Sequence, residues 1–132
     1  MSLNAGLLVE FIRRDLQLGS TPTQSQNRIN DFFLRLEPKL QQNWNLGALS
    51  ALAGYSPAHF NRLCIQQLNT TPMKKLRQLR MQRAKALLAT TELKLSDIAT
   101  AVGYRDVFNF SSAFKREEGL APNAYRSKKE RA

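Results

Sequence analysis

Two adjacent side chains, Asn61 and Arg62, carry planar hydrogen-bonding groups that can recognise the edges of nucleic acid bases. An asparagine amide can form two hydrogen bonds with adenine, and an arginine guanidinium can do the same with guanine. Both residues fall on the outward face of a helix predicted from 57 to 68, together with Ala58 and Ile65. We therefore expect Ala58, Asn61 and Arg62 to contact base pairs.

A second candidate face lies nearer the C-terminus and offers weaker chemistry. Ser111 and Ser112 are short side chains that can both donate and accept hydrogen bonds. Val107 and Phe108 offer apolar surface, which suits thymine methyl groups or a locally deformed groove. Phe108 has two possible placements: it points outward as a base contact, or it tucks beneath the helix that closes the chain, with Asn109 then facing outward.

Other polar and basic side chains are expected to contact phosphates, because phosphate contacts position a protein on DNA without reading its sequence. Arg77 and Lys85 are expected to touch phosphate or to raise the local positive potential. The expected phosphate contacts are Ser56, His59, Lys74, Lys75, Arg105, Asn109 and Lys115.

Catalytic chemistry has few candidates. His59 is the single histidine and Cys64 the single cysteine, and a spacing of five points them away from each other on a helix. One cysteine excludes an internal disulfide and any metal site built on several thiolates, and it fits a reducing cytoplasm. We expect no catalysis, metal or cofactor in this chain, with His59 at the surface and Cys64 in the core.

The charge balance indicates a polyanionic partner. The 132 residues carry a formal charge of +10, with a pI near 10.4. Residues 73 to 94 hold seven basic groups and one acid, so the positive charge is concentrated there. A simple solubility role for the charge is the alternative. No stretch is long and apolar enough for a membrane span, and the N-terminus lacks the pattern of a signal peptide.

The candidate faces belong to two copies of one unit, at 46–72 and 95–122. In each copy a short helix, a turn containing glycine and a second helix follow one another, which is the helix-turn-helix pattern. The two helix-turn-helix segments are predicted at 46–68 and 95–118. Leu46, Leu49, Gly54, Tyr55, Phe60 and Pro72 match Leu95, Ile98, Gly103, Tyr104, Phe110 and Pro122 in order, with one extra residue in the second copy.

Local signals set the limits of these helices. Asn45, Ser56 and Asp106 stand at N-cap positions, where a side-chain oxygen can accept a backbone N–H bond. Gly54 suits a left-handed C-terminal cap. Lys94 stands where a serine or threonine would cap the next helix, so we expect that helix to begin without a side-chain cap.

A helix from 73 to 91 connects the two units, because this stretch has no proline or glycine and is rich in helix formers. Arg80 and Arg83 fall within its apolar face, and a buried arginine needs partners. We expect one of them to pair with an acid from a neighbouring helix, with Asp97 as the first candidate.

Residues 1–25 precede the repeats as an amphipathic helix followed by a polar linker, which is predicted at 20–27. The helix could pack on its own protein, belong to a missing domain or form a dimer contact. A further helix with apolar residues from Ile29 to Leu40 should kink or restart at Pro38, and Trp44 should pack on the core. A short helix at NAYRSKK should close the chain.

The chain resembles the DNA-binding domain of the AraC/XylS family of bacterial transcription regulators. The resemblance covers residues 30 to 128, and its most specific part runs from the connecting helix to the P-x-x-Y-R sequence ending at Arg126. It implies an all-α domain at 26–132, with two helix-turn-helix units whose second helices enter successive major grooves. This chain has Ser112 where the family usually has an arginine, so we expect weaker base reading by the second unit.

The resemblance also implies partners. These are double-stranded promoter DNA and, in the intact regulator, RNA polymerase. Residues 1–25 then look like the end of a sensor or dimerisation domain that is otherwise absent, through which the protein could form a dimer. The implied location is the bacterial cytoplasm, at the nucleoid when DNA is bound. The alternative function is a nonspecific architectural protein that binds nucleic acid through charge and apolar wedges.

Overall fold

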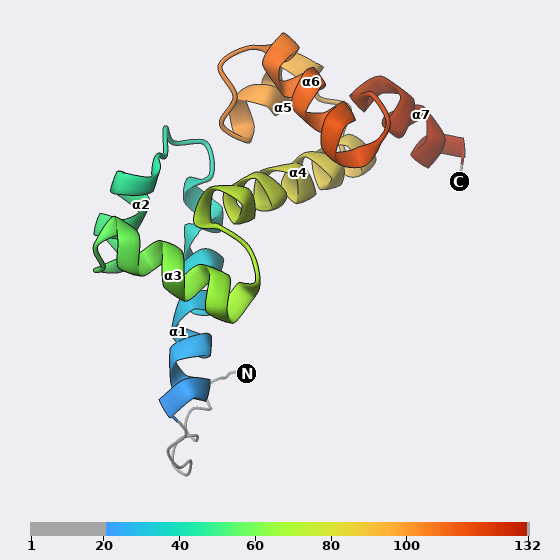
Figure 1. The fold of residues 1–132 in the computed structure, drawn as a ribbon. Coiled ribbons are helices and arrows are strands. Elements are labelled where there is room, and N and C mark those ends of the chain that lie inside the picture. Colours follow the sequence, from blue (N-terminus) through green and yellow to red (C-terminus); the bar gives the residue numbers. More distant parts are fainter. Residues whose placement is uncertain (1–20, 132) are drawn as a thin grey trace.

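The computed structural model describes residues 21–131, and within this range every regular element is helical (Figure 1). Two helix-turn-helix units lie at the two ends of one long helix, as predicted. The predicted N-terminal helix lies outside the described residues. The elements are α1 (Thr21–Leu36), the 3₁₀ helix η3 (Glu37–Lys39), α2 (Leu46–Ala53), α3 (Pro57–Leu68), α4 (Pro72–Thr90), α5 (Leu95–Ala101), α6 (Val107–Glu118) and α7 (Pro122–Arg131).

The first unit is built from α1, η3, α2, α3 and the beginning of α4. Its core contains a cluster of three phenylalanines, in which Phe32 meets Phe33 and Phe60 edge to face at 5.1 and 5.5 Å between ring centroids. Pro38 ends α1 and lies in η3, which confirms the expected restart. Trp44 packs against this core and donates its indole N–H to the Lys39 carbonyl at 2.8 Å.

The second unit is built from the end of α4 with α5, α6 and α7. Phe110 and Phe114 are fully buried in its core, and Tyr125 of α7 packs on Phe114 at 5.6 Å. Arg126 donates from Nε to the Leu88 carbonyl and from Nη2 to the Thr91 carbonyl, each at 3.2 Å. These carbonyls end α4 and lack partners within the helix, so Arg126 both caps α4 and attaches α7 to it.

The helix limits follow the predicted caps. Asn45, Ser56 and Asp106 accept backbone N–H bonds from Ala48, His59 and Asn109 at 2.8, 3.2 and 2.8 Å. Gly54 is left-handed with φ 87°. Lys94 makes no side-chain cap, so α5 begins without one, as expected.

Two predicted limits are wrong. The segment 21–27 is the beginning of α1 and not a linker, because Pro22 lies in the first turn, where its missing N–H would have no helical partner in any case. The closing helix is also longer than NAYRSKK, since it runs from Pro122 to Arg131.

The arginines of α4 have partners other than the predicted one. Arg83 does pair with an acid, but the acid is Glu37 of η3, at 3.3 Å. Asp97 is exposed on α5, so its carboxylate is already hydrated and the prediction that it pairs with Arg80 or Arg83 is wrong. Arg80 bonds backbone carbonyls of the first unit instead.

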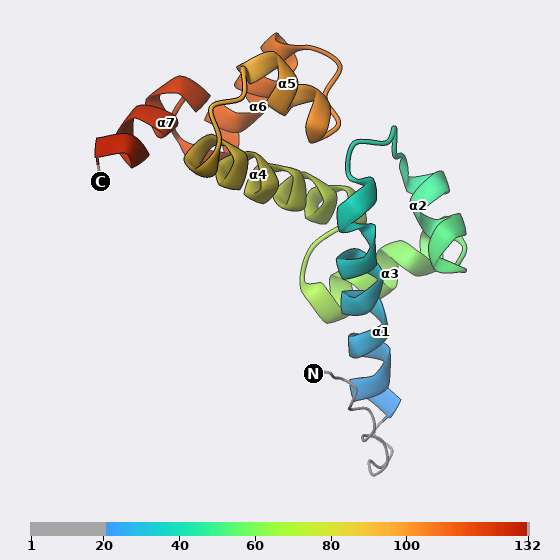
Figure 2. The same ribbon diagram turned by 180° about the vertical axis from the view of Figure 1, so that it is seen from behind.

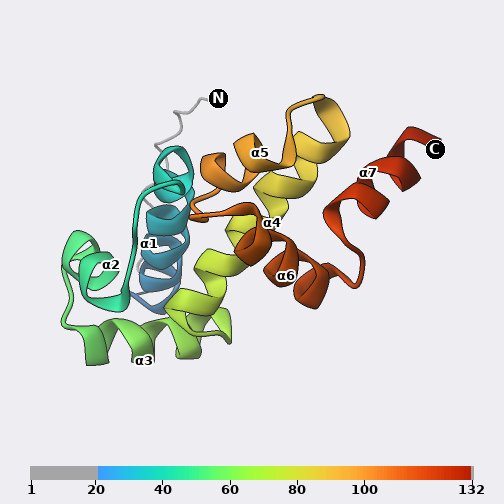
Figure 3. The ribbon, with the colours of Figure 1, turned by 90° about the horizontal axis from the view of Figure 1, so that it is seen from above.

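The arrangement places α3 and α6 on one side of the molecule. Both lie toward the viewer in Figure 1 with α1 and α5 behind them, and the reverse view shows α1 and α5 in front (Figure 2). Seen from above, α4 runs obliquely between the two units (Figure 3). No helix in the described range has the length and apolarity needed to span a membrane.

Candidate nucleic-acid interface

The exposed face of α3 carries the first set of predicted base contacts. Phe60 and Cys64 are fully buried and hold the helix against the first core. As predicted, this orientation leaves Ala58 and Arg62 exposed, while Asn61 is half-buried. Ile65 is 46% exposed on the same side. The structure therefore brings these residues together on one helical surface.

A stack of side chains supports Arg62. The His59 ring lies on the Tyr55 ring with centroids 5.2 Å apart and planes 17° from parallel. Arg62 Nη2 is 3.4 Å from His59 Nδ1, one helical turn further along. Because Tyr55 is also stacked on the buried Phe60, this chain of contacts connects Arg62 to the core and restricts its position. Ordering a long side chain before binding lowers the entropy cost of a base contact.

Gln66 was missed in the sequence analysis. It is exposed on α3 four residues after Arg62, so both side chains lie on the same face of the helix. A glutamine amide can form two hydrogen bonds with adenine. The spacing of four from Arg62 was the signal that could have identified it.

The exposed face of α6 carries one large apolar side chain among small and polar ones. Phe108 is 80% exposed, so the alternative in which it tucks beneath the closing helix is wrong. The reason is the helical register, since Phe110, Ala113 and Phe114 turn inward and point position 108 to the opposite side. Val107 and Ser111 are half-buried and Ser112 is exposed.

Asn109 is exposed beside Phe108 but already has a partner. Its side-chain Nδ2 donates to Asp106 Oδ2 at 3.2 Å, while its backbone N–H donates to Asp106 Oδ1 at 2.8 Å. If Asn109 contacts a phosphate, as predicted, its side-chain amide must bond the phosphate and Asp106, the N-cap residue of α6, at the same time. Arg105 is exposed immediately before this cap.

Some basic side chains of α4 form ion pairs within the protein, and others are exposed to solvent. Arg77 lies 3.8 Å from Glu117, and Lys85 lies 3.1 Å from Glu118, both acids being on α6. These pairs reduce the local potential that Arg77 and Lys85 were expected to raise, and the sequence could not show them. Lys74 on α4 and Lys115 on α6 are exposed, whereas Lys75 is half-buried beside Phe33 and Leu34 of α1.

The only cysteine is an inert core residue. Cys64 has no exposed surface, and desolvation by burial raises the pKa of its thiol to about 11. His59, by contrast, is exposed, as predicted. A thiol that stays protonated at neutral pH is a poor nucleophile, so Cys64 is a poor candidate for a nucleophile.

The Cys64 pKa predicts how stability depends on pH. The folded pKa is raised above that of the unfolded thiol, so the stabilisation is present below pH 9 and is lost as pH rises toward 11. The loss should be on the order of 2 kcal/mol. Urea unfolding between pH 8 and 11 should show a steeper decline for the native chain than for Cys64→Ala. Parallel declines in the two proteins would contradict the assignment.

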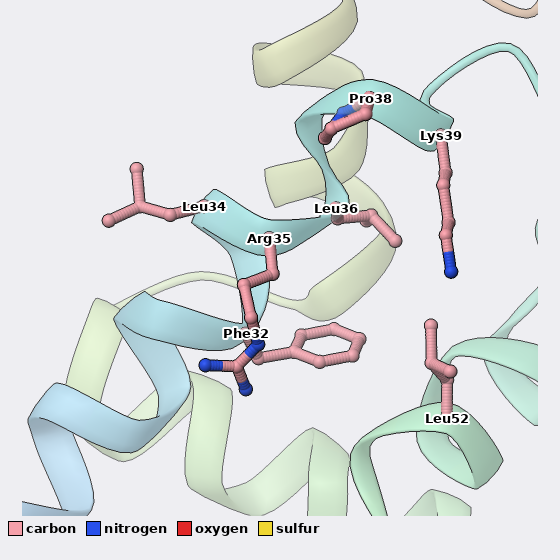
Figure 4. A pocket seen from close by; sticks show the side chains of 7 residues that line it. All are labelled: Phe32, Leu34, Arg35, Leu36, Pro38, Lys39 and Leu52. Atoms are coloured by element: carbon pink, nitrogen blue, oxygen red, sulfur yellow. The ribbon is translucent and has the colours of Figure 1, made fainter.

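A pocket of about 470 Å³ opens between α1, η3 and α2 (Figure 4). Phe32 and Leu52 approach each other across it, and Leu34 is 68% exposed at its edge. None of the candidate DNA contacts lines this pocket. It is therefore a separate surface from the faces of α3 and α6.

Comparison with known proteins agrees with this geometry. A family model described as a helix-turn-helix domain matches residues 49–128. The Raffinose operon transcriptional regulatory protein RafR of Pediococcus pentosaceus is 38% identical over 91 residues, which are 66% of this chain and 33% of RafR. The transcriptional activator RhaR of Escherichia coli is 32% identical over 123 residues, which are 92% of this chain and 44% of RhaR. The chain thus spans less than half the length of either relative.

Solved structures show the same fold. A transcriptional regulator with an AraC-type DNA-binding domain from Chromobacterium violaceum superposes with a TM-score of 0.73 at 25% identity, covering 81% of this chain and 96% of the other. The DNA-binding domain of AdpA, solved in complex with a target DNA, superposes with a TM-score of 0.71 at 24% identity, covering 76% and 91%.

The two helix-turn-helix units and their exposed helices define a DNA-binding protein. The fold and family are those of transcription regulators and not of enzymes. The chain belongs to the AraC-type family of transcription regulators, and its function is sequence-specific binding of DNA in transcription regulation.

Proposed function

We propose that one chain binds duplex DNA through α3 and α6 in two adjacent segments of the major groove. The observation that carries this proposal is the placement of α3 and α6 on one side of the molecule, at opposite ends of α4 (Figure 1). The 19 residues of α4 correspond to about 28 Å at 1.5 Å per residue. One turn of DNA is roughly 34 Å long, so both helices can reach the same face of the duplex.

Base reading is assigned mainly to the first unit. Arg62 and Asn61 are suited to guanine and adenine edges, and Ala58 to a thymine methyl group. On α6, Phe108 and Val107 would make apolar contacts, with Ser111 and Ser112 as weaker hydrogen-bonding partners. Phe108 is 80% exposed, so its ring is available for contact with DNA.

Phosphate contacts are assigned to groups around the two recognition helices. Ser56 and His59 lie at the N-terminus of α3, and Arg105 and Asn109 at the N-terminus of α6. Backbone N–H groups and the helix dipole favour an anion at such positions. Lys74, Lys75 and Lys115 complete the set. Lys75 is the weakest member because it is half-buried beside α1.

The intact regulator is proposed to contain further parts. The chain spans 33% of RafR and 44% of RhaR. We assign the residues from 21 onward to the DNA-binding domain, since 21–25 lie in α1, and the residues before them to the end of a sensor or dimerisation domain. Contact with RNA polymerase, dimer formation through the missing domain and activation, for which RhaR is named, belong to the same proposal. A domain that binds bacterial promoters would work in the cytoplasm, at the nucleoid.

Footprinting tests the two-segment proposal directly. A preferred duplex would be selected with this chain from a random library and then probed by chemical protection of major-groove guanines. We expect protection of two segments about one helical turn apart on one face, and weak competition by random DNA. Protection of a single segment would contradict the proposal. Equal competition by random DNA would favour the architectural alternative.

A further inference from the structure

Arg80 lies at the point where α4 passes from one core to the other. Leu79 before it belongs to the first core, and Met81 after it belongs to the second. The guanidinium donates from Nε to the Leu40 carbonyl at 3.1 Å and from Nη2 to the Gln42 carbonyl at 2.8 Å. Both carbonyls lie in the segment between η3 and α2. Arg80 therefore bonds two fixed backbone points of the first unit.

The second unit contacts the same guanidinium. Arg80 Cζ lies 5.9 Å from the centroid of the Tyr104 ring, within the range of a cation–π interaction. Tyr104 in turn packs on the buried Phe110 at 5.8 Å. Burial lowers the pKa of Arg80 and raises that of Tyr104, which agrees with a partly buried contact. Arg80 thus joins a loop of the first unit to the core of the second.

Gly103 allows the two units to approach each other closely. A Cβ atom at this position would lie 2.6 Å from the Leu40 carbonyl oxygen and 2.7 Å from Arg80 Nη2. The equivalent glycine of the first unit, Gly54, also has a positive φ, but a Cβ there would have nothing within 4 Å. Gly54 is therefore needed for its backbone conformation alone, whereas Gly103 must also lack a side chain.

A cleft lies beside this junction. A cleft of about 210 Å³ separates Gln41 and Asn43 of the first unit from Thr100 and Arg105 of the second, with Gly103 at its edge. Two partly exposed ion pairs also connect α4 to the units, Arg83 with Glu37 and Arg77 with Glu117, and exposed pairs of this kind stabilise weakly. The relative position of the two units consequently depends mainly on the continuity of α4 and on the contacts that converge on Arg80.

We propose that Arg80 and Gly103 form a junction that fixes the position of α6 relative to α3, and that this junction determines which spacing between two DNA half-sites the chain accepts. This inference rests on the two-segment binding proposed above. One added base pair moves the second half-site by about 3.4 Å and rotates it by about 34°. With a rigid junction, α6 cannot move to reach the displaced half-site. With a loosened junction, it can. Arg80 and Gly103 are positioning residues and need not touch DNA.

The first test measures the junction without DNA. Spin labels at Ala51→Cys on α2 and Ser96→Cys on α5, both exposed positions, report the separation of the units, while the buried Cys64 stays unlabelled. We expect a narrow distance distribution in the otherwise native chain. Arg80→Met and Gly103→Ala should broaden or shift it. Arg35→Met, which removes the same charge from an exposed position of α1, and Gly54→Ala, which strains the backbone without a clash, should not.

The second test measures spacing preference. Each protein is titrated with the selected duplex and with duplexes carrying one or two inserted base pairs between the half-sites. The native chain and both control variants should lose at least about tenfold in affinity on insertion, as expected when the second half-site loses base contacts. Arg80→Met should bind the selected duplex more weakly than the native chain does. Its affinity should fall markedly less than the native affinity when base pairs are inserted.

The outcomes separate the two proposals. If Arg80→Met and Gly103→Ala keep the native distance distribution and spacing preference, the junction proposal is overturned. If the native chain protects only one DNA segment, the two-segment proposal fails. The distance measurement still tests the junction in that case, because it does not involve DNA. Thermal unfolding confirms that each variant is folded. If Arg80→Met is unfolded, Arg80→Lys, which keeps the charge but cannot span both carbonyls, replaces it in both tests.

Discussion

Arg62→Ala is expected to relax base preference at one position of the first half-site by roughly 5- to 150-fold, while recognition elsewhere in the site is retained. This range corresponds to the roughly 1 to 3 kcal/mol that a bidentate side-chain contact contributes to discrimination. Arg62 is exposed, it is held beside His59, and none of the ion pairs among the described residues involves it. Its guanidinium is therefore free to bond a base edge.

Ser112→Ala is the matched variant in the second recognition helix. Ser112 is exposed at a comparable place on α6, but a hydroxyl bonds several bases equally well. We expect less than about a threefold change in discrimination. Both variants are titrated against duplexes with each single-base substitution across the selected site. Equal losses in the two half-sites, or a larger loss from Ser112→Ala, would show that reading is not concentrated in α3.

The helix limits were predictable from sequence because they depend on neighbouring residues. Asn45, Ser56 and Asp106 each cap the backbone three residues ahead, and such contacts need no knowledge of the tertiary fold. The same holds for the left-handed Gly54. The beginning of α1 was missed because the first turns of this helix are polar, and a polar stretch with a proline is also typical of a linker.

The partners of the charged residues were not predictable in the same way. Arg83 finds Glu37, which is 46 residues away, and Arg80 finds two carbonyls at a similar separation. The Arg77 and Lys85 pairs with α6 depend on how α6 packs against α4. The exposed sides of α3 and α6 could be predicted from helical periodicity, but the number of basic groups available to DNA required the tertiary structure.

Phe60→Ala and Phe110→Ala are expected to be the most destabilising single changes, at about 3 to 5 kcal/mol each. Both rings are fully buried at equivalent positions of the two repeats. Phe60 packs with Phe32 and Phe33 in the first core, and Phe110 packs with Tyr104 and Phe114 in the second. Each substitution removes an aromatic ring from the centre of one core and leaves the other core intact.

The two cores can be followed separately because the single tryptophan, Trp44, packs against the first. In urea titrations, Phe60→Ala should move the Trp44 fluorescence transition to lower urea. Phe110→Ala should move the unfolding transition seen by circular dichroism to lower urea. The transition seen by Trp44 fluorescence should stay nearer its native midpoint. Gly54→Ala, whose effect on the first unit is confined to backbone strain, should shift the fluorescence midpoint less than Phe60→Ala. If both signals move together by the same amount in Phe110→Ala, the units unfold as one cooperative body and the two cores are not independent.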